Sequence, residues 1–530
     1  MLLASRLDTR ADDYRANRTA MAALVDQVQA EHDKVVSGGG ERYVQRHRER
    51  GKLMIRERID LLVDASAPFL ELSPLAGWGT SDPLGGGLVT GIGTVSNVEC
   101  VIIGNDPTVR GGTLTPTTMT KLLRAMEISQ SNRLPIVNLT ESGGGDLPKQ
   151  ADFFVRGGAQ FKLLTQLSAE GIPSITIVFG SSTAGGAYVP GMSDYTILIR
   201  HRSKVFLGGP PLVKMAIDED ADEEELGGAD MHARVSGLGD YLAEDEVDAI
   251  RIARQVAAHL QWRKLGPGPT RAAILPRYDP DELLGVAPTD VAVPYDAREI
   301  LARVLDGSDF EEFKPLYGTT LVTGWGSIAG FPVGVLANNG ILFSEESQKG
   351  AQFIQLCNRS GTPLVFFQNI TGFMVGTRYE QGGIIKDGAK LINAVANSTV
   401  PHVTLMVGAS YGAGNYGMSG RAYDPRFVFT WPHHRIAVMG GKQLGGVMSI
   451  VKRRSAEATG QPFTDEDEAE LRRSIVEQVD GESTALFSTG RVWDDGIIDP
   501  RDTRIVLGLA LSATHSAPVE GARTYGTFRM

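Results

Sequence analysis

The sequence has few of the residues that build disulfide frameworks or zinc sites. Only two of its 530 residues are cysteine, Cys100 and Cys357, and no C-x-x-C pair occurs. Both lie in apolar, strand-like segments, so we expect buried free thiols and no disulfide. The N-terminal segment is charged from Arg6 onward and lacks an apolar signal core. These absences predict a cytoplasmic protein in a reducing compartment, with no metal bound by this chain.

Long apolar runs and an excess of positive charge are also lacking. No stretch of 18 consecutive apolar residues occurs, which argues against a membrane-spanning helix. The formal net charge is −11, which argues against a nucleic-acid-binding surface. Much of the acidity lies in one run, Asp218 to Glu225, which we interpret as a solvated loop. We therefore expect neither nucleic acid nor a membrane among the partners.

What the sequence does contain is an internal repeat. Residues 88–106 and 321–339 are offset by 233 (321 − 88) and read LVTGIGTVSNVECVIIGND and LVTGWGSIAGFPVGVLANN. Two further pairs are offset by 228 (362 − 134 and 400 − 172). They are LPIVNLTESGG with TPLVFFQNITG, and IPSITIVFGSSTAGGAY with VPHVTLMVGASYGAGNY. The repeat predicts a duplicated α/β unit, with strands and helices alternating as in a covered, mostly parallel sheet.

Periodicity and turn residues give a coarse map of the elements. We expect helices over residues 20–45, 117–132, 160–169, 297–305 and most of 472–514, and an amphipathic helix ending near residue 62. We expect two strands within residues 85–106 that turn at Ser96-Asn97, and further strands over 135–140 and 174–179. The proline-rich stretch 265–294 is the expected linker, which divides the chain into domains 1–270 and 271–530.

Each half also contains a strand that ends in a glycine-rich turn. The turns read VFGSSTAGGA and VGASYGAGN, so that Gly185 and Gly186 correspond to Ala413 and Gly414 at the 228-residue offset. Amides at a helix start have no intrahelical acceptor and, with the helix dipole, favour negative charge. Two such amides directed at a thioester oxygen would form an oxyanion hole for an enolate. The alternative is two tight turns that serve packing alone.

The chain resembles the carboxyltransferase (β) subunit of biotin-dependent acyl-CoA carboxylases, closest to the 3-methylcrotonoyl-CoA carboxylase branch. The strings that carry the resemblance are NRLPIVNLTESGG, TAGGAYVPGMSD, GGPPLVK, ELGGADMHARVSG, QNITGFMVG, GASYGAGNYGM and the terminal GTFRM. The resemblance implies tandem crotonase-like (ββα superhelix) domains, the first on the acyl-CoA side and the second on the biotin side. It also implies a hexameric β core, a trimer of head-to-tail dimers, with each active site between two subunits.

The resemblance assigns different roles to the two turns. Gly185 and Gly186 are expected to hold the acyl-CoA thioester oxygen, and Ala413 and Gly414 the ureido oxygen of carboxybiotin. The implied reaction releases CO2 from carboxybiotin, removes an α- or vinylogous γ-proton from the thioester, and joins the enolate to CO2. Both anions need amide donors and neither step needs a protein acid or base. This agrees with the lack of a His–Asp or paired-carboxylate motif in the sequence.

Further residues are expected to line the two pockets. On the acyl-CoA side they are Ser142, Gly143, Gly144, Ala187 and, as a possible phosphate contact, Arg110. On the biotin side they are Thr371, Gly372, Phe373 and Tyr416. Solvated surface charge is the alternative for Arg110, and also for Arg56 and Arg58, which are weaker phosphate candidates. His433 and His434 we interpret as structural. Gly145-Asp146 and the segment 154–168 depart from the methylcrotonoyl pattern, which leaves the substrate open.

Biotin must come from a partner, because the chain has no AMKM-type biotinylation site and no ATP-grasp signature. The resemblance implies an α subunit with biotin carboxylase and biotin carboxyl carrier domains, in an assembly of six α and six β subunits. We expect a coenzyme A thioester as substrate and neither ATP nor metal on this chain. Four alternatives stay open: an acetyl-, propionyl- or long-chain acyl-CoA carboxylase β subunit, a decarboxylase subunit, a non-catalytic scaffold, and a simple crotonase with Glu141 as its lone base.

Overall fold

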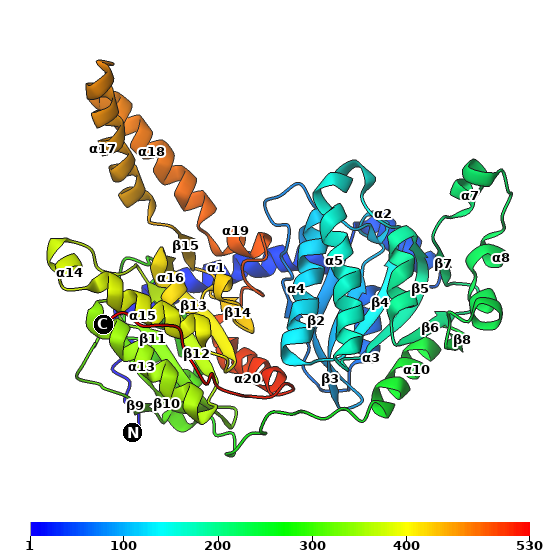
Figure 1. The fold of residues 1–530 in the computed structure, drawn as a ribbon, viewed down its shortest axis with the longest axis horizontal. Helices are drawn as coiled ribbons and strands as arrows, with labels where there is room; N and C mark the ends of the chain where they lie inside the picture. Colours follow the sequence, from blue (N-terminus) through cyan, green and yellow to red (C-terminus); the bar gives the residue numbers. More distant parts are fainter. Residues whose placement is uncertain (1) are drawn as a thin grey trace.

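The computed structural model describes residues 2–530 and contains two β-sheets, one in each half of the chain (Figure 1). The first sheet comprises β1 (Leu70–Leu72), β2 (Leu88–Val95), β3 (Val98–Asn105), β4 (Ile136–Ser142), β5 (Ser174–Thr183), β6 (Tyr195–Ile199), β7 (Lys204–Phe206) and β8 (Tyr241–Ala243). The second comprises β9 (Glu311–Glu312), β10 (Leu321–Ile328), β11 (Phe331–Asn338), β12 (Leu364–Ile370), β13 (His402–Tyr411), β14 (Phe427–Thr430) and β15 (Arg435–Ala437).

The two sheets have the same topology at their centres. The strand orders are β1-β2-β3-β4-β5-β6-β8, with β7 on β5, and β14-β13-β12-β11-β10-β9, with β15 on β13. The hairpins β2–β3 and β10–β11 are antiparallel, and the following pairs β3–β4, β4–β5, β11–β12 and β12–β13 are parallel. Even the register shift recurs, so that Ser142 pairs with Ser182 and Ile370 with Ser410. The expected duplication is confirmed.

Helices cover both sheets. In the first half they are α1 (Asp12–Val36), α2 (Glu41–Glu49), α3 (Ile55–Leu62), α4 (Pro116–Asn132), α5 (Gln150–Ala169), α6 (Tyr188–Met192), α7 (Pro210–Ile217), α8 (Glu223–Gly227), α9 (Ala229–Met231) and α10 (Glu246–His259). Those that follow are α11 (Leu283–Val286), α12 (Arg298–Val304), α13 (Ser344–Ser360), α14 (Thr377–Gln381), α15 (Ile384–Asn397), α16 (Ala413–Gly417), α17 (Gly441–Thr459), α18 (Asp465–Glu482), α19 (Ala485–Gly490) and α20 (Thr503–Thr514).

Two expectations about the helices were wrong. The helix expected over 160–169 begins at Gln150, because two consecutive glycines, Gly157 and Gly158, weaken the helical pattern without breaking the helix. The helix expected over 20–45 is two helices, separated where Gly38 and Gly40 take positive φ. The stretch 265–294, the expected linker, contains the buried helix α11, which packs against α1. Gly285 is required there, because a Cβ would lie 2.3 Å from the Tyr14 ring.

A buried carboxylate joins the two halves. Asp495 lies in the C-terminal segment and accepts hydrogen bonds from Arg124 of α4 (Nε, 2.8 Å) and from Arg421 (2.7 Å). It also accepts one from the backbone N–H of Val428 (2.8 Å), and its own carbonyl accepts one from Ser73 N–H (2.7 Å). Burial opposes its ionisation, but the two guanidinium groups hold the pKa of Asp495 well below its usual value. This carboxylate therefore lies ionised between elements of both halves.

The neighbouring Asp494 has the opposite electrostatic behaviour, and this gives a pH prediction. Burial raises the pKa of Asp494 to about 7, although Ser488 and Thr489 oppose the shift. In the unfolded chain the Asp494 carboxyl ionises near pH 4. The stabilising contribution of its neutral form in the folded chain is therefore fully present below that pH. The contribution is lost as pH rises to about 7. Asp494→Asn mimics the neutral acid. We expect it to raise the free energy of unfolding, relative to the unmodified protein, by more at pH 8 than at pH 5. Urea unfolding at both pH values measures this, and an equal effect at both would contradict it.

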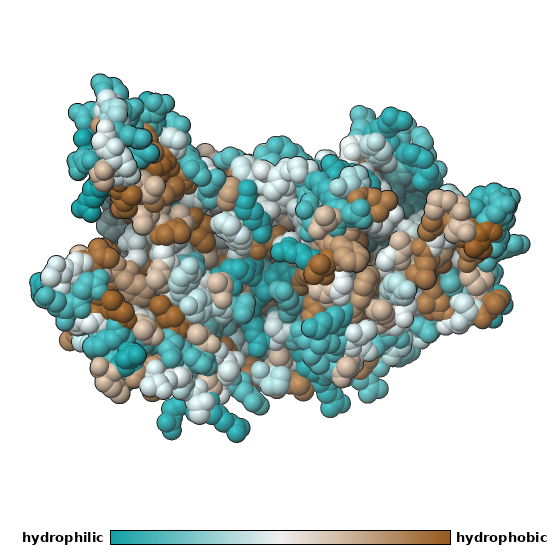
Figure 2. Space-filling view, turned by 45° about the horizontal axis from the view of Figure 1, so that its top comes forward, coloured by the Kyte–Doolittle hydropathy of each residue, from teal (hydrophilic) through white to brown (hydrophobic). Residues whose placement is uncertain are grey.

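Two arms extend from the body (Figure 1). The hairpin α17–α18 projects from the second half, and α7 and α8 lie at the far end of the first. Figure 2 shows apolar surface along the hairpin, where α17 exposes Val447, Met448, Ile450 and Val451.

The acidic run 218–225 is largely exposed, as expected, although α8 begins within it. Both cysteines are free and buried. Within residues 2–530, none of the helices combines the length and the apolar character that crossing a bilayer requires.

Candidate functional site

The first glycine-rich turn follows β5 directly. Strand β5 ends at Thr183, and a short 3-10 turn, η4 (Ala184–Ala187), leads into α6. Ala184 takes a positive φ of 53°, which turns the chain sharply. Gly185 is exposed and Gly186 is buried, and Ser182 Oγ donates to the Gly186 carbonyl (2.9 Å). The first amides of such a turn have no acceptor within it, so they are available to a ligand.

The second turn repeats this geometry after β13. Gly412 takes a φ of 55°, at the position equivalent to Ala184 (412 − 184 = 228), and α16 then begins at Ala413. Ala413 is exposed and Gly414 is buried, which matches their counterparts in the first turn. Asn415 Nδ2 donates to Ser410 Oγ (2.7 Å). The two turns therefore share a positive φ at equivalent positions and the same pattern of exposure, as well as sequence.

A loop lies beside each turn and is built alike in both halves. Leu114 N–H donates to the Gly144 carbonyl (2.9 Å), and Leu342 N–H donates to the Gly372 carbonyl (3.2 Å). Gly144 and Gly372 have φ of 100° and 135°, which L-residues rarely adopt. In the first half, Ser142 Oγ donates to the Gly112 carbonyl (2.7 Å). In the same loop, Gly143 N–H donates to the Gly111 carbonyl (3.1 Å). Gly144 and Gly372 thus occupy equivalent places in the two loops.

An apolar cavity of about 590 Å³ adjoins the first turn. Gly185, Gly186 and Ser142 line it where it meets the turn. Helices α4 and α5 supply most of its apolar wall, through residues that include Met119, Leu122, Phe153 and Phe161. Ala187, which was expected in the acyl pocket, packs with Val178 and Leu198 in a separate core cluster. The turn thus combines amide donors with an apolar space large enough for an acyl chain.

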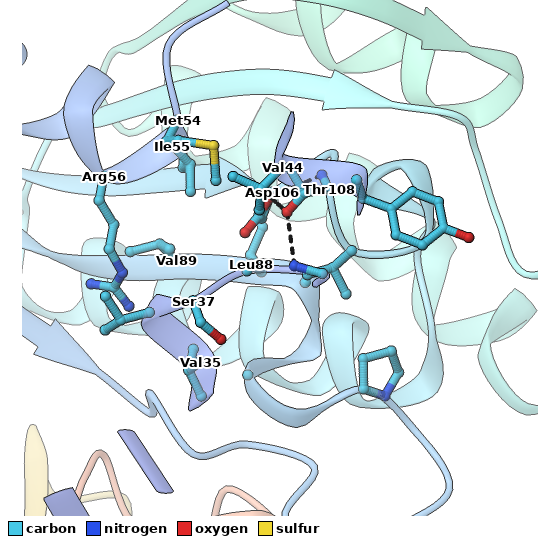
Figure 3. Close-up of a pocket in the computed structure, with 18 of the residues that line it drawn as sticks. Val35, Ser37, Val44, Met54, Ile55, Arg56, Leu88, Val89, Asp106 and Thr108 are labelled. Carbon is cyan, nitrogen blue, oxygen red and sulfur yellow. Dashed lines mark hydrogen bonds between the residues drawn. The ribbon is translucent and has the colours of Figure 1, made fainter. Parts of the chain in front are cut away.

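A second, larger cleft lies beyond the short turn η2 (Arg110–Gly112) and has a volume of about 840 Å³. Figure 3 shows Asp106 and Thr108 together in its wall and Arg56 farther along it. Arg110 lines this cleft with a half-exposed side chain, and its nearest carboxylate is Asp146 at 3.6 Å. Arg56 instead makes two hydrogen bonds to Glu71 (2.7 and 2.8 Å). Of these two cations, Arg110 has the longer carboxylate contact and the more exposed side chain.

Two candidate groups are unavailable for acid–base or phosphate chemistry. Arg58 is fully buried and bonded to Glu141 and Glu246, so it is neither a solvated charge nor exposed to a phosphate. Glu141 in turn is paired with Lys52 and Arg58, which removes the lone base that a simple crotonase would need. Burial lowers the pKa of His433 to about 3 and of His434 to about 4, so both rings are neutral at physiological pH.

On the second half, aromatic side chains lie around the turn at Ala413. Tyr416 is partly exposed and stacks on Tyr423, with ring centroids 5.7 Å apart. Phe373 packs between Gly388 and Gly417, where a Cβ would lie 3.2 and 3.3 Å from its ring. Thr371 is exposed beside it. Aromatic side chains thus flank the exposed start of α16, and such side chains commonly line ligand pockets.

The two turns lie in different halves of one chain. In Figure 1, β5 belongs to the half on the right, whereas α16 belongs to the half on the left. Sequence reasoning found both turns but missed the residues that support them. Phe153, Gly157 and Phe161 follow one another at helical spacing, which is a signal available in the sequence. Lys52 carries no such signal, because its partners Glu141 and Phe179 are 89 and 127 residues away.

The comparisons with known proteins agree with one another. Residues 46–527 match the family model described as the carboxyl transferase domain. The chain is 57% identical to a probable biotin-dependent acyl-coenzyme A carboxylase beta2 subunit of Mycobacterium tuberculosis, over the full length of both. It is 47% identical to the mitochondrial methylcrotonoyl-CoA carboxylase beta chain of Dictyostelium discoideum, over 100% of this chain and 91% of that one.

A solved structure supports the same relationship. The geranyl-CoA carboxylase beta subunit of P. aeruginosa matches with a TM-score of 0.91 and 44% identity, over the whole of both chains. The duplicated sheets of this chain therefore have the tandem crotonase-like fold expected from the sequence.

Proposed function

The chain belongs to the carboxyl transferase family as the carboxyltransferase (β) subunit of a biotin-dependent acyl-CoA carboxylase, and from this premise we propose a branched or unsaturated acyl-CoA, such as 3-methylcrotonoyl-CoA, as its substrate. The observation that carries the proposal is the pair of equivalent turns, one of which opens onto an apolar cavity. We assign the thioester oxygen to Gly185 and Gly186, and the biotin ureido oxygen to Ala413 and Gly414.

The role of this chain is to hold two anions. When bound, carboxybiotin supplies the CO2 and the base. The amides at Gly185 and Gly186 donate to the thioester oxygen as it gains charge in the enolate, and the turn at Ala413 donates to the ureido oxygen. Because both sets of donors are fixed by tight turns, they need little reorganisation as charge develops. No side-chain acid or base of this chain enters the scheme, and the neutral His433 and ion-paired Glu141 agree with that.

The apolar cavity supports a substrate with a branched or longer acyl chain. Gly157 lies on α5 one helical turn from both Phe153 and Phe161, and no atom lies within 4 Å of the Cβ that another residue would add there. The two rings therefore leave a space between them. This space favours an acyl group larger than acetyl, because an empty apolar cavity forgoes contact energy that a longer chain would supply.

Filling that space provides a test of substrate size. We expect Gly157→Leu to lower kcat/KM for a ten-carbon thioester such as geranyl-CoA by about tenfold or more, since each excluded methylene costs about 1 kcal/mol or more. The kcat/KM for propionyl-CoA should change little. Gly481→Leu is the matched control, because Gly481 is also a helical glycine with no atom within 4 Å of an added Cβ but lies in α18, outside the lining of the cavity. Equal losses for the long and short thioesters would contradict this assignment.

We place the phosphates of coenzyme A in the 840 Å³ cleft, at Arg110. This cleft and the acyl cavity lie on either side of η2, whose Gly112 carbonyl is bound by Ser142 at the cavity wall. A thioester with its acyl group in the cavity would thus pass over Arg110–Gly112 on its way to the cleft. The side chain of Arg110 lies at that passage, half exposed and 3.6 Å from the Asp146 carboxylate.

We further propose that the active site forms between two copies of the chain, in a hexameric β core built from head-to-tail dimers. The support is that the two turns lie in separate halves and that α17 exposes an apolar face. The proposal includes an α subunit with biotin carboxylase and biotin carrier domains, the domain division 1–270 and 271–530, and a cytoplasmic location, which the free cysteines suit.

The experiment that tests the function uses the chain co-expressed with its biotin-bearing partner. ATP-dependent fixation of labelled bicarbonate would be followed on 3-methylcrotonoyl-, geranyl-, propionyl-, acetyl- and a long-chain acyl-CoA. We expect the highest kcat/KM on a branched unsaturated thioester. Preference for acetyl-CoA would overturn the substrate, and inactivity of an intact complex on every thioester would overturn the function.

A further inference from the structure

In each half, the strand before the glycine-rich turn accepts a hydrogen bond from a side chain outside the sheet. The two accepting carbonyls are at equivalent positions. The carbonyls of Phe179 in β5 and Val407 in β13 correspond at the 228-residue offset (407 − 179). Lys52 Nζ donates to the Phe179 carbonyl (3.4 Å), and the Tyr295 hydroxyl donates to the Val407 carbonyl (2.8 Å). Each carbonyl lies in the strand that leads to its glycine-rich turn. One side chain from outside the sheet therefore bonds to each of these strands before it turns.

In the first half this support is a buried cluster of charges. Lys52 pairs with Glu141, Glu141 pairs with Arg58 (3.0 Å), and Arg58 makes two hydrogen bonds to Glu246 (2.9 and 3.0 Å). Arg58 is 0% exposed, Glu246 4% and Glu141 8%. The Arg58 guanidinium also lies 4.2 Å from the centre of the Phe179 ring. The cluster thus contacts both the end of β4 and the middle of β5.

The geometry of Glu141 shows how closely this cluster lies against the strand. A Cβ on Gly180 would be 2.6 Å from Glu141 Oε1, so only glycine admits the carboxylate there. Glu141 immediately precedes Ser142, which pairs with Ser182 across the register shift and lines the acyl cavity. A movement of Glu141 would therefore displace Ser142 and, through Ser182, the turn at Gly185.

The second half holds its strand with neutral groups. Asn369 is the counterpart of Glu141, and Gly408 is the counterpart of Gly180. A Cβ on Gly408 would lie 2.3 Å from Asn369 Oδ1. Asn369 Oδ1 accepts directly from the Ala409 N–H (3.1 Å). Asn369 thus bonds directly to β13, whereas Glu141 is joined to β5 through Lys52. Buried ion pairs are often no more stabilising than apolar packing, so stability alone does not account for the charged version.

We propose, given the function proposed above, that Lys52 is a positioning residue for the acyl-thioester turn: it ties Glu141 at the end of β4 to the Phe179 carbonyl in β5 and so fixes the amides of Gly185 and Gly186. Oxyanion donors act only when they are held in place before charge develops. A displacement of about 1 Å from a remote change can cost about 100-fold in rate. The cluster thus acts on kcat, through the turn, without touching the substrate.

The test compares Lys52→Met with two other variants in the co-expressed complex. Lys264→Met is the matched control, because Lys264 also pairs with a glutamate (Glu99, 2.8 Å) and donates to a backbone carbonyl (Ser512, 2.8 Å) away from both turns. Lys52→Arg is the conservative variant, which keeps a cation and donors. For each we would measure kcat and KM for the acyl-CoA, and the decay of carboxybiotin without acyl-CoA.

We expect Lys52→Met to lower kcat about tenfold or more, to change the KM for the acyl-CoA less than threefold, and to leave carboxybiotin decay unchanged. Lys52→Arg should recover most of the rate. A kcat equal to that of Lys264→Met would overturn the proposal. If Lys52→Met does not fold, Glu141→Gln replaces it, and loss of folding in both would also overturn it, since the cluster would then be structural. Inactivity of the unmodified complex would instead count against the proposed function.

Discussion

Replacing Gly414 by valine is expected to lower kcat for carboxylation about 100-fold or more, the loss typical of removing an oxyanion donor. Gly414 is buried at the start of α16, and a Cβ there would lie 2.5 Å from Cγ1 of the fully buried Ile370. The Gly372 backbone, 3.4 Å from the same point, closes the other side. The turn must therefore shift to admit the side chain, which displaces the amides that we assign to the ureido oxygen.

The position of the defect distinguishes this prediction from general damage. Binding of the acyl-CoA should be retained in Gly414→Val, because the first turn lies in the other half of the chain. Gly481→Ala is the control, since Gly481 is exposed in α18 and no atom lies within 4 Å of its added Cβ. Stopped-flow turnover together with acyl-CoA binding by calorimetry measures both quantities. A kcat within threefold of the unmodified enzyme would show that the Ala413-Gly414 turn is not a catalytic site.

The second large effect is expected on stability. We expect Asp495→Asn to lower the free energy of unfolding by about 3–5 kcal/mol, because it leaves two buried guanidinium groups without their counter-charge. Arg124 comes from the first half and Arg421 from the second, and their side chains are only 13% and 23% exposed. The amide also places donors where the carboxylate accepted the Val428 N–H.

Chemical denaturation of the isolated β subunit measures this loss as a lower urea midpoint. Asp465→Asn is the matched control, because Asp465 also pairs with an arginine (Arg453, 3.0 Å) but its side chain is 93% exposed. Exposed ion pairs contribute little, so the midpoint of the control should not move. Equal midpoints for the two variants would show that the buried carboxylate does not join the halves energetically.

The sequence by itself determined the features that depend on local chain geometry. The repeat predicted two similar sheets, and the alternation of apolar residues placed most strands within a few residues. The glycine turns were found because a sharp turn after a buried strand demands particular small residues. The positive φ at Ala184 and Gly412 recurs at the repeat offset as well. Strings of residues in the correct order also indicated the family, since they record the same local requirements.

Only the tertiary structure decided which side chains meet over long separations. Nothing near Lys52 in the sequence indicates its contacts with Glu141 and Phe179, and nothing links Arg124 to Asp495 across 371 residues. The acyl cavity likewise exists only because α4 and α5 pack beside the first turn. Ion pairs and cavities depend on how elements pack in space, and packing leaves no periodic pattern in the chain. For that reason the sequence identifies the two turns that we assign to the anions, whereas the tertiary structure decides which side chains support those turns.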